Sequence, residues 1–399
     1  MRQFDTLTAF LLSKSSDAAR KPLVSVQGFT TQADGGDGEW EFTGVIGQTP
    51  SQSPAQLLDG LCTDASGNQY SLDLYETIKV KSLGAIGDGV ADDTLPIQAA
   101  FNHQSRVSVN FLNTTTGGSV SSRAMPYVDF GKNIYSVTSP ISVYTYIYMT
   151  GDQAVIMNNT GGVEPVFRMT DGDWTITAGW IGVVKDIQIT GNAFQLNSRN
   201  NLGNALDQGK ITFDGVTFTN ADIALEYDLQ SSIVQFTRCK WDKCVTHIKQ
   251  YACDLVNIDQ CWIHTRTNSL GDYGTFFELA GVQANITANV FVPSPQTLGS
   301  LEIAWFSNET VTNPQGQSKI GLRQFAATGN RFGGEPGSCS IINWYQGAAF
   351  VPSHGSNISL KDNLMTSVYG PDEESTSINL FELPNAISVI DNIGVIFQG

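Results

Sequence analysis

The sequence predicts an all-β protein, a right-handed parallel β-helix in which short strands stack coil on coil. Segments that alternate apolar and polar residues recur from about residue 185 onward, with almost no helical pattern between them. Glycines number 39, and charged residues make up only 15% of the 399 residues. This composition favours strands and turns over long solvated helices.

Each recurring segment reaches a small, Asn or Cys residue at a bend. Short spacings between these residues suit one coil, and longer ones indicate a coil that carries a loop. Asn side chains stacked at a bend can hydrogen-bond along the ladder. A β-sandwich is the alternative, which repeats of this regularity disfavour. The predicted bend residues are Asn192, Gly215, Cys239, Cys261, Asn289, Asn330, Asn363 and Asn392, with successive spacings of 23, 24, 22, 28, 41, 33 and 29.

The pattern divides the chain into two domains. A small N-terminal module is expected over residues 1–76, where a Gly/Asp turn leads into an alternating segment at residues 30–42. The β-helix is expected over residues 77–399. It opens with a strand, a glycine turn and a helix at about 94–103, for which Asp93 or Thr94 supplies the N-cap. Pro96 lies in the first turn of this helix, where its missing N–H costs nothing.

Charge and hydropathy exclude several classes of protein. The net charge of −16 disfavours DNA or RNA as a ligand, although a local basic cleft would still admit an acidic polysaccharide. No apolar run approaches the ~20 residues of a membrane-spanning helix. Residues 1–21 do not form a convincing signal peptide, so we expect synthesis in the host cytoplasm and release by another route, such as lysis.

The six cysteines are expected to be free, buried thiols. None forms a CxxC pair, and their spacings do not fit a zinc site. They are Cys62, Cys239, Cys244, Cys253, Cys261 and Cys339.

Two motifs resemble those of a known family. The segment Val80–Phe101 is similar to the opening motif of the pectate-lyase-like β-helix superfamily, as found in bacteriophage tailspikes and capsule depolymerases. Residues Gly35–Trp40 resemble the glycine-rich turn of tailspike N-terminal modules. The matching residues of the opening motif are Gly84, Ala85, Gly87, Asp88, Gly89, Asp92, Asp93, Thr94, Ile97, Gln98, Ala99 and Ala100.

The resemblance implies a single-stranded, pectate-lyase-like β-helix whose first coil is capped by a helix. It also implies a homotrimer on the phage tail or baseplate, attached through the N-terminal module, that recognises a bacterial surface polysaccharide. The motif is more specific for the fold than for the chemistry.

Cleavage of a glycan by hydrolysis needs two carboxyl groups, so candidates are carboxylates on the outer face of one sheet. If Leu225 and Tyr227 point inward, Glu226 and Asp228 point outward. The following coils would present His247, Lys249 and Tyr251, and then Glu278. The predicted catalytic residues are Glu226, Asp228 and Glu278, the predicted substrate-binding residues are Lys249, Tyr251, Trp305 and Trp344, and Trp262 and Tyr345 are further aromatic candidates.

The favoured function is a phage tailspike that binds and hydrolyses a bacterial surface polysaccharide as an endo-glycosidase. Alternatives are a non-catalytic glycan-binding tail fibre, a polysaccharide lyase and a structural virion protein. A lyase would use Lys, Tyr or His as its base, with His247 or His264 beside Lys249 or Arg266. No cofactor or metal is expected, because Asp88, Asp92 and Asp93 suit turn formation and helix capping better than a calcium site.

Overall fold

A computed structural model describes most of the chain, and two units are each described by themselves: Met1–Gly161 and Gly162–Gly399. The described residues are 2–12, 23–30, 32, 34, 36–45, 61–72, 77–114, 126–143, 146–169, 181–197, 209–228, 232–266, 277–279, 283–292, 305–307, 311–312, 318–319, 324–334, 339–345, 357–367, 376–380, 386–390 and 396–398.

The N-terminal module is a five-stranded sheet with one short helix. The helix α1 (Leu7–Leu11) is capped by Thr6, whose hydroxyl accepts from the Ala9 N–H at 3.1 Å. The core of the module holds Phe10, Trp40 and Tyr70, each at most 2% exposed. The strand order is β1 (Arg2–Phe4), β2 (Leu23–Val26), β3 (Gly38–Val45), β5 (Asn68–Leu72) and β4 (Leu61–Thr63), with β1 and β2 parallel and the other pairs antiparallel.

The same unit contains the first coils of the β-helix and the predicted capping α-helix. The helix α2 spans Thr94–Thr114, so it starts where predicted and runs past the expected end at residue 103. The remaining elements are β6 (Thr77–Lys79), the 3-10 helix η3 (Val80–Leu83), β7 (Asp88–Asp92), β8 (Tyr127–Asp129), β9 (Ile134–Val137), β10 (Ile141–Val143) and β11 (Tyr146–Asn158). Parallel pairings join β6, β8 and β11, and likewise β7, β9 and β11.

The acidic cluster of the opening motif forms turns and caps. Asp88 accepts from two backbone N–H groups, and Asp92 accepts from the Thr94 N–H at 3.0 Å. Asp93 accepts from the Ile86 N–H at 2.7 Å and so closes the glycine turn. Burial raises the pKa of Asp93, although these N–H groups act in the opposite direction. Asp93 occupies the N-cap position, because its backbone carbonyl accepts from the Ile97 N–H at 3.1 Å. Its carboxylate serves the glycine turn, however, and it is Asp92 that accepts from the N–H of Thr94.

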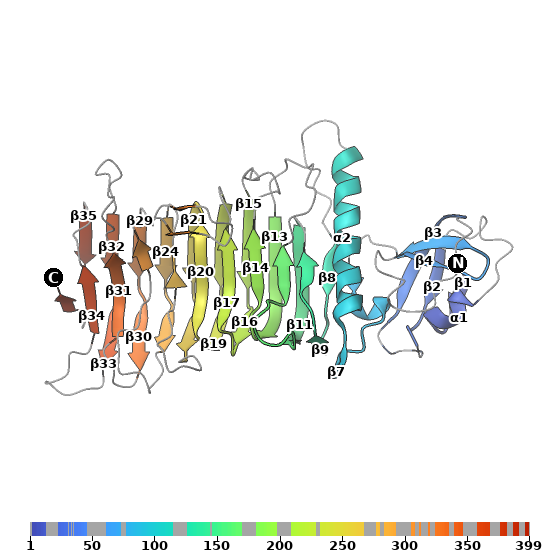
Figure 1. Cartoon of the computed structure of the whole chain (residues 1–399), viewed down its shortest axis with the longest axis horizontal. Coiled ribbons are helices and arrows are strands. Elements are labelled where there is room, and N and C mark those ends of the chain that lie inside the picture. The colour runs from blue at the N-terminus through green and yellow to red at the C-terminus, as the bar shows by residue number, and fades with distance from the viewer. Residues whose placement is uncertain are drawn as a thin grey trace. The chain divides into compact units, whose positions relative to one another are not determined.

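The second unit is a right-handed parallel β-helix whose strands stack coil on coil along its length (Figure 1). The strand pairings define three sheets. The first sheet contains β12 (Phe167–Met169), β14 (Phe194–Asn197), β17 (Ile223–Asp228), β20 (Thr246–Ala252), β23 (Phe277–Glu278), β26 (Trp305–Ser307), β31 (Cys339–Tyr345), β34 (Thr376–Leu380) and β36 (Ile396–Gln398).

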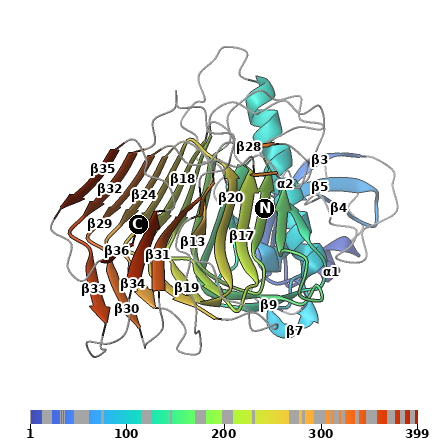
Figure 2. The ribbon, with the colours of Figure 1, turned by 60° about the vertical axis from the view of Figure 1, so that its left-hand side comes forward.

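The second and third sheets both begin at β13 (Ile181–Thr190), which pairs with β15 through its first half and β16 through its second. The second sheet continues through β15 (Gly209–Asp214), β18 (Ser232–Thr237), β21 (Leu255–Asp259), β24 (Gln283–Thr287), β29 (Gln324–Thr328), β32 (Asn357–Lys361) and β35 (Ala386–Ile390) (Figure 2).

The third sheet continues through β16 (Thr217–Thr219), β19 (Lys240–Cys244), β22 (Trp262–Thr265), β25 (Val290–Val292), β30 (Arg331–Gly334) and β33 (Leu364–Ser367). The short strands β27 (Val311–Thr312) and β28 (Ser318–Lys319) form a separate antiparallel pair.

The bend between the second and third sheets repeats in every described coil from β13 to β33. One residue adopts a left-handed conformation, and the next residue points into the core. The left-handed residues are Asp186, Gly215, Arg238, Gln260, Ala288, Gly329 and Asp362, with φ from 52° to 66°. The inward row is therefore Ile187, Val216, Cys239, Cys261, Asn289, Asn330 and Asn363.

Two predicted bend residues do not belong to this inward row. Gly215 is the left-handed residue itself, one position before Val216. Asn192 follows a different bend, at which Gly191, Asn220 and Lys243 have positive φ. Alternation alone predicted the repeat, but it did not predict which of the two corners of a coil each residue occupies. Asn392 lies outside the described residues.

The predicted asparagine ladder is confirmed for Asn289, Asn330 and Asn363. Asn330 Oδ1 accepts from the backbone N–H of Asn289 at 3.0 Å and from its Nδ2 at 3.1 Å. Asn330 Nδ2 donates to the Ile286 carbonyl at 2.8 Å and to Asn363 Oδ1 at 2.9 Å. The ladder extends to Cys261, whose N–H donates to Asn289 Oδ1 at 2.8 Å. Each amide thus satisfies buried polar groups of two coils.

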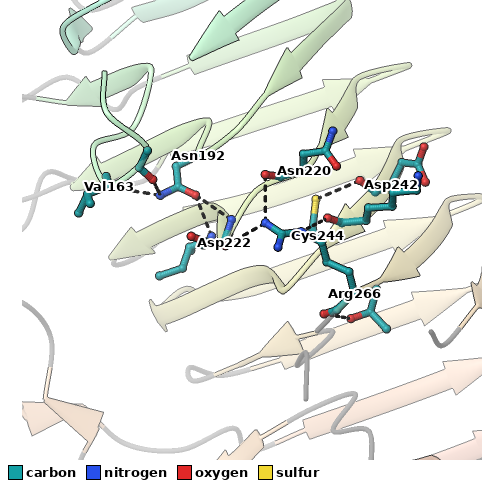
Figure 3. A network of polar contacts seen from close by, with 11 residues as sticks. Val163, Asn192, Asn220, Asp222, Asp242, Cys244 and Arg266 are labelled. Carbon is teal, nitrogen blue, oxygen red and sulfur yellow. Dashed lines mark hydrogen bonds and ion pairs between the residues drawn. The ribbon is translucent and has the colours of Figure 1, made fainter. Parts of the chain in front are cut away.

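A second corner precedes the strands of the first sheet (Figure 3). Asn192 Oδ1 accepts from the N–H groups of Asp222 and Ile223 at 3.0 and 2.9 Å, while its Nδ2 donates to the Val163 carbonyl at 3.1 Å. Arg266 donates to the Lys243 carbonyl at 2.7 Å and to Asp222 Oδ1 at 2.9 Å. Side chains of three coils therefore fix the point at which β17 begins.

Native thiols are expected not to react with Ellman's reagent at pH 8. Cys62, Cys239, Cys244, Cys253 and Cys261 are free and buried. Burial raises the pKa of Cys244 and of Cys253 to about 12, which leaves roughly one part in ten thousand as thiolate at pH 8. A Cys339→Ser variant should give no fast colour when folded and five equivalents in denaturant. Rapid labelling of the folded variant would contradict this burial.

Candidate functional site

The predicted site residues fall on one row of the first sheet. In the parallel register, Arg168 pairs with Gln195, Gln195 with Glu226, and Glu226 with Lys249. The row continues from Lys249 to Glu278, from Glu278 to Trp305, and from Trp305 to Asn343. Neighbouring positions are ~4.8 Å apart, so polar groups follow the stacking direction over several coils.

Alternation places this row on the outer face at β17. Leu225 and Tyr227 are buried in the core at 0% and 1% exposure, while Glu226 between them is partly exposed. The inward direction of Leu225 and Tyr227 agrees with the sequence-based expectation. Burial of the two apolar neighbours fixes the register, because a shift of one residue would put the carboxylate in the core.

Both carboxyl oxygens of Glu226 accept hydrogen bonds. Gln195 Nε2 donates to Oε2 at 2.9 Å, and the Tyr251 hydroxyl donates to Oε1 at 2.7 Å. Gln195 is itself oriented by Arg168, whose Nε donates to the Gln195 Oε1 at 3.0 Å. Arg168 also forms an ion pair with Glu164. The hydrogen bond from Arg168 therefore fixes the orientation of the Gln195 amide, with its NH2 group toward the Glu226 carboxylate.

An irregularity in β20 brings Tyr251 to Glu226. The pairing of β17 with β20 shifts after Tyr227, so that Asp228 pairs with Ala252 rather than with Tyr251. The Tyr251 side chain leans back over the row and is only 5% exposed. The Nζ of Lys249 lies 5.6 Å from the centre of its ring. Such bulges redirect side chains next to functional sites.

Asp228 lies two positions beyond Glu226 on the same strand, after the register shift, and is buried at 3% exposure, which differs from the exposed outward position that strict alternation predicts. Residues at i and i+2 of a strand are roughly 6–7 Å apart at the backbone.

Three predicted residues are placed by backbone register only. Glu278 pairs with Lys249 on one side and Trp305 on the other, so both continue the row. Trp344 pairs with Phe306 and belongs to the adjacent position instead. The side chains of all three lie outside the described residues.

The histidine and Trp262 expectations need correction. His247 does not point outward: it is 0% exposed and packs against Trp241 and Phe277, with Nε2 3.1 Å from the His264 carbonyl oxygen. His264 and Trp262 lie on β22 of the third sheet, away from the Glu226 row. A lyase base at His247 is thus wrong, because its ring is buried among aromatic side chains of the core and does not face outward.

Sequence reasoning missed Arg168 and Gln195. Alternation in Val166–Met169 and Phe194–Asn197 could have predicted that both side chains face outward. It could not predict that these segments pair in register with β17, because the loops between them differ in length.

No group of three His, Cys, Asp or Glu side chains able to hold a metal ion occurs within the described ranges. In the same part of the chain, no helix is long and apolar enough to span a membrane.

Comparison with known proteins gives matches in solved structures alone. No protein-family model matches the chain, and no curated protein matches it. The chain is similar in structure to phage tailspikes. The tailspike of Acinetobacter baumannii phage AM24 shares 12% identity at a TM-score of 0.43, with 93% of this chain and 63% of that chain covered.

Two similar structures are not phage proteins. WceF of Pantoea stewartii, a glycan biofilm modifying enzyme with a tailspike-like parallel β-helix fold, shares 13% identity at a TM-score of 0.42, and 90% of this chain and 51% of that chain are covered. The adhesin PfbA of Streptococcus pneumoniae shares 14% identity at a TM-score of 0.36, with 79% and 91% covered. The likeness concerns the fold, so a function has to be argued from this chain's own residues.

Proposed function

We propose that this protein binds a bacterial surface polysaccharide and hydrolyses it at the Glu226 row. The observation that carries the proposal is a carboxylate held at both oxygens, Glu226, in a row of polar residues that crosses at least four coils. A row of this length suits a polymer better than a small molecule. Lys249 and Tyr251 would bind the substrate beside the carboxylate, as would Trp305, the continuation of the row.

In this proposal, Glu226 and Asp228 form the catalytic pair. Glu226 accepts at both oxygens, which suits a base or nucleophile, and Asp228 would protonate the leaving oxygen. Their backbone positions lie roughly 6–7 Å apart, above the ~5.5 Å between the carboxyl groups of retaining glycosidases and at the lower end of the ~6.5–9.5 Å of inverting ones. Glu278, two positions along the row from Glu226, is the alternative partner at roughly 10 Å before side chains lean together.

A lyase is the second candidate, favoured by Tyr251, whose ring centre lies 5.6 Å from the Nζ of Lys249. One experiment separates the candidates: the protein is incubated with purified capsule or O-antigen polysaccharides, and polymer length, reducing ends and ultraviolet absorbance are followed. Hydrolysis should shorten the polymer and add reducing ends without absorbance. An unsaturated product that absorbs would establish a lyase, and a bound polymer of unchanged length would establish an adhesin.

The resemblance of the opening motif supports a wider proposal. We propose a homotrimeric tailspike on the phage virion, attached to the tail or baseplate through residues 1–76. Light scattering on the purified protein should give a mass near three times 43.1 kDa. A monomer at all concentrations would contradict the trimer and leave the Glu226 row untouched.

A further inference from the structure

The third sheet carries a second polar surface, made by two outward rows. One row comprises Thr190, Thr219, Asp242 and His264, and the other comprises Gln188, Thr217, Lys240 and Trp262. Between them, Phe218, Trp241 and Ile263 are 0% exposed, so strand alternation turns both rows outward. The first row crosses four coils, a length of ~14 Å.

Trp262 is only partly covered, whereas Trp40 and Trp241 are at most 1% exposed. It is the one tryptophan, among those whose side chains the structure describes, that reaches solvent. The Nζ of Lys240 lies 4.8 Å from its ring centre, and the His264 ring stands edge-on at 5.4 Å. A partly exposed indole presents an apolar ring and an N–H group together, and such side chains are enriched at interfaces.

The polar groups beside Trp262 form one connected set. His264 Nδ1 lies 3.0 Å from Asp242 Oδ1, and Lys240 Nζ lies 3.5 Å from Asp242 Oδ2. Desolvation would raise the pKa of Asp242, but the hydrogen bond from His264 and the charge of Lys240 hold it below its usual value. The hydroxyls of Thr190 and Thr219, 3.0 Å apart, continue the set.

We infer that this surface is a second glycan-binding site, separate from the Glu226 row. An aromatic ring that packs against sugar C–H groups, a carboxylate that accepts from hydroxyls, and imidazole and ammonium donors are the groups that recognise a sugar. One carboxylate and one ammonium leave the patch near neutral in a chain of net charge −16, which suits uncharged sugar units.

This surface binds without cutting. Asp242 is the single carboxylate in the eight residues of the two rows, and hydrolysis needs two. The inference rests on the proposed function, because both sites would hold the same polymer. A second contact with one polymer raises its apparent affinity through effective concentration.

The test counts bound sugars. An array of purified bacterial surface polysaccharides first identifies one that the Glu226→Gln protein retains. An oligosaccharide of a few repeat units is then titrated by calorimetry into Glu226→Gln alone and combined with Trp262→Ala, Asp242→Asn or Ile233→Ala. Ile233 is an exposed apolar side chain on the second sheet and serves as the matched control.

We expect two oligosaccharides per chain for Glu226→Gln and for the Ile233→Ala combination, and one when Trp262 or Asp242 is also changed. Intact polymer should bind at least about tenfold more weakly to those two variants. One sugar per chain throughout overturns the second site and leaves the proposed function standing. Failure to retain any glycan overturns both. A change of oligomeric state in Trp262→Ala, with no loss of sugar, would assign the patch to a protein interface and overturn the inference.

Discussion

Replacing Glu226 by Gln is expected to lower the rate of polysaccharide cleavage by roughly 10²- to 10⁴-fold, the usual contribution of a positioned acid or base. The amide keeps the size of the side chain; its oxygen can accept from Gln195 Nε2 and its NH2 group can donate to the Tyr251 hydroxyl oxygen, so the strand should fold unchanged. It can neither take a proton nor attack the sugar. Appearance of reducing ends, measured on equal amounts of folded protein, gives the ratio.

The matched control is Asp259→Asn. Asp259 is a partly exposed carboxylate at the end of β21, on the second sheet, and belongs to no part of the Glu226 row. Its variant should cut at the wild-type rate. Loss of cleavage in both variants would point to a general effect of charge, and full cleavage by Glu226→Gln would place the chemistry elsewhere.

Replacing Asn330 by Ala is expected to destabilise the β-helix by about 3–5 kcal/mol. The side chain is 1% exposed and makes four hydrogen bonds, two as acceptor and two as donor. Removing it leaves the Asn289 N–H and the Ile286 carbonyl buried without these partners, at ~1–3 kcal/mol each, and adds a small cavity. Urea unfolding followed by circular dichroism would measure the change.

Asn285→Ala is the corresponding control. Asn285 lies on the preceding coil, on the outer face of the second sheet, where its Nδ2 donates to Asn257 Oδ1 at 2.9 Å. Water can replace that hydrogen bond, so a loss within about 1.5 kcal/mol is expected. Equal losses in the two variants would show that the buried ladder adds nothing beyond an ordinary amide contact.

Much of the fold could be predicted because a β-helix is built from local, repeated signals. Alternation located the strands of β17, β20 and β23, and it placed Glu226, Lys249 and Glu278 at successive positions of one row. The asparagines that recur at successive bends predicted the hydrogen-bonded ladder inside the β-helix. The start of α2 followed from its cap and from Pro96.

The rest depends on where the backbone departs from strict alternation. A residue in the left-handed conformation precedes each inward bend residue. Non-glycine residues such as Arg238 and Gln260 adopt this conformation, so the residue type does not reveal where it occurs. Tyr251 reaches Glu226 only through the register shift in β20. The inward turn of His247 has the same kind of cause, since corners are set by contacts between coils that one sequence does not display.

At the bend between the second and third sheets, the stacking of the coils does not depend on how many residues each coil contains. Successive left-handed residues from Gln260 to Ala288 are 28 apart, and from Ala288 to Gly329 they are 41 apart, yet Asn289 and Asn330 remain hydrogen-bonded neighbours. A coil can therefore gain a dozen residues without any cost to the ladder. The loops that leave a coil can change in length and sequence while the stacked strands and the Glu226 row stay in place, so the surface beside that row can be altered by insertion and exchange of loops.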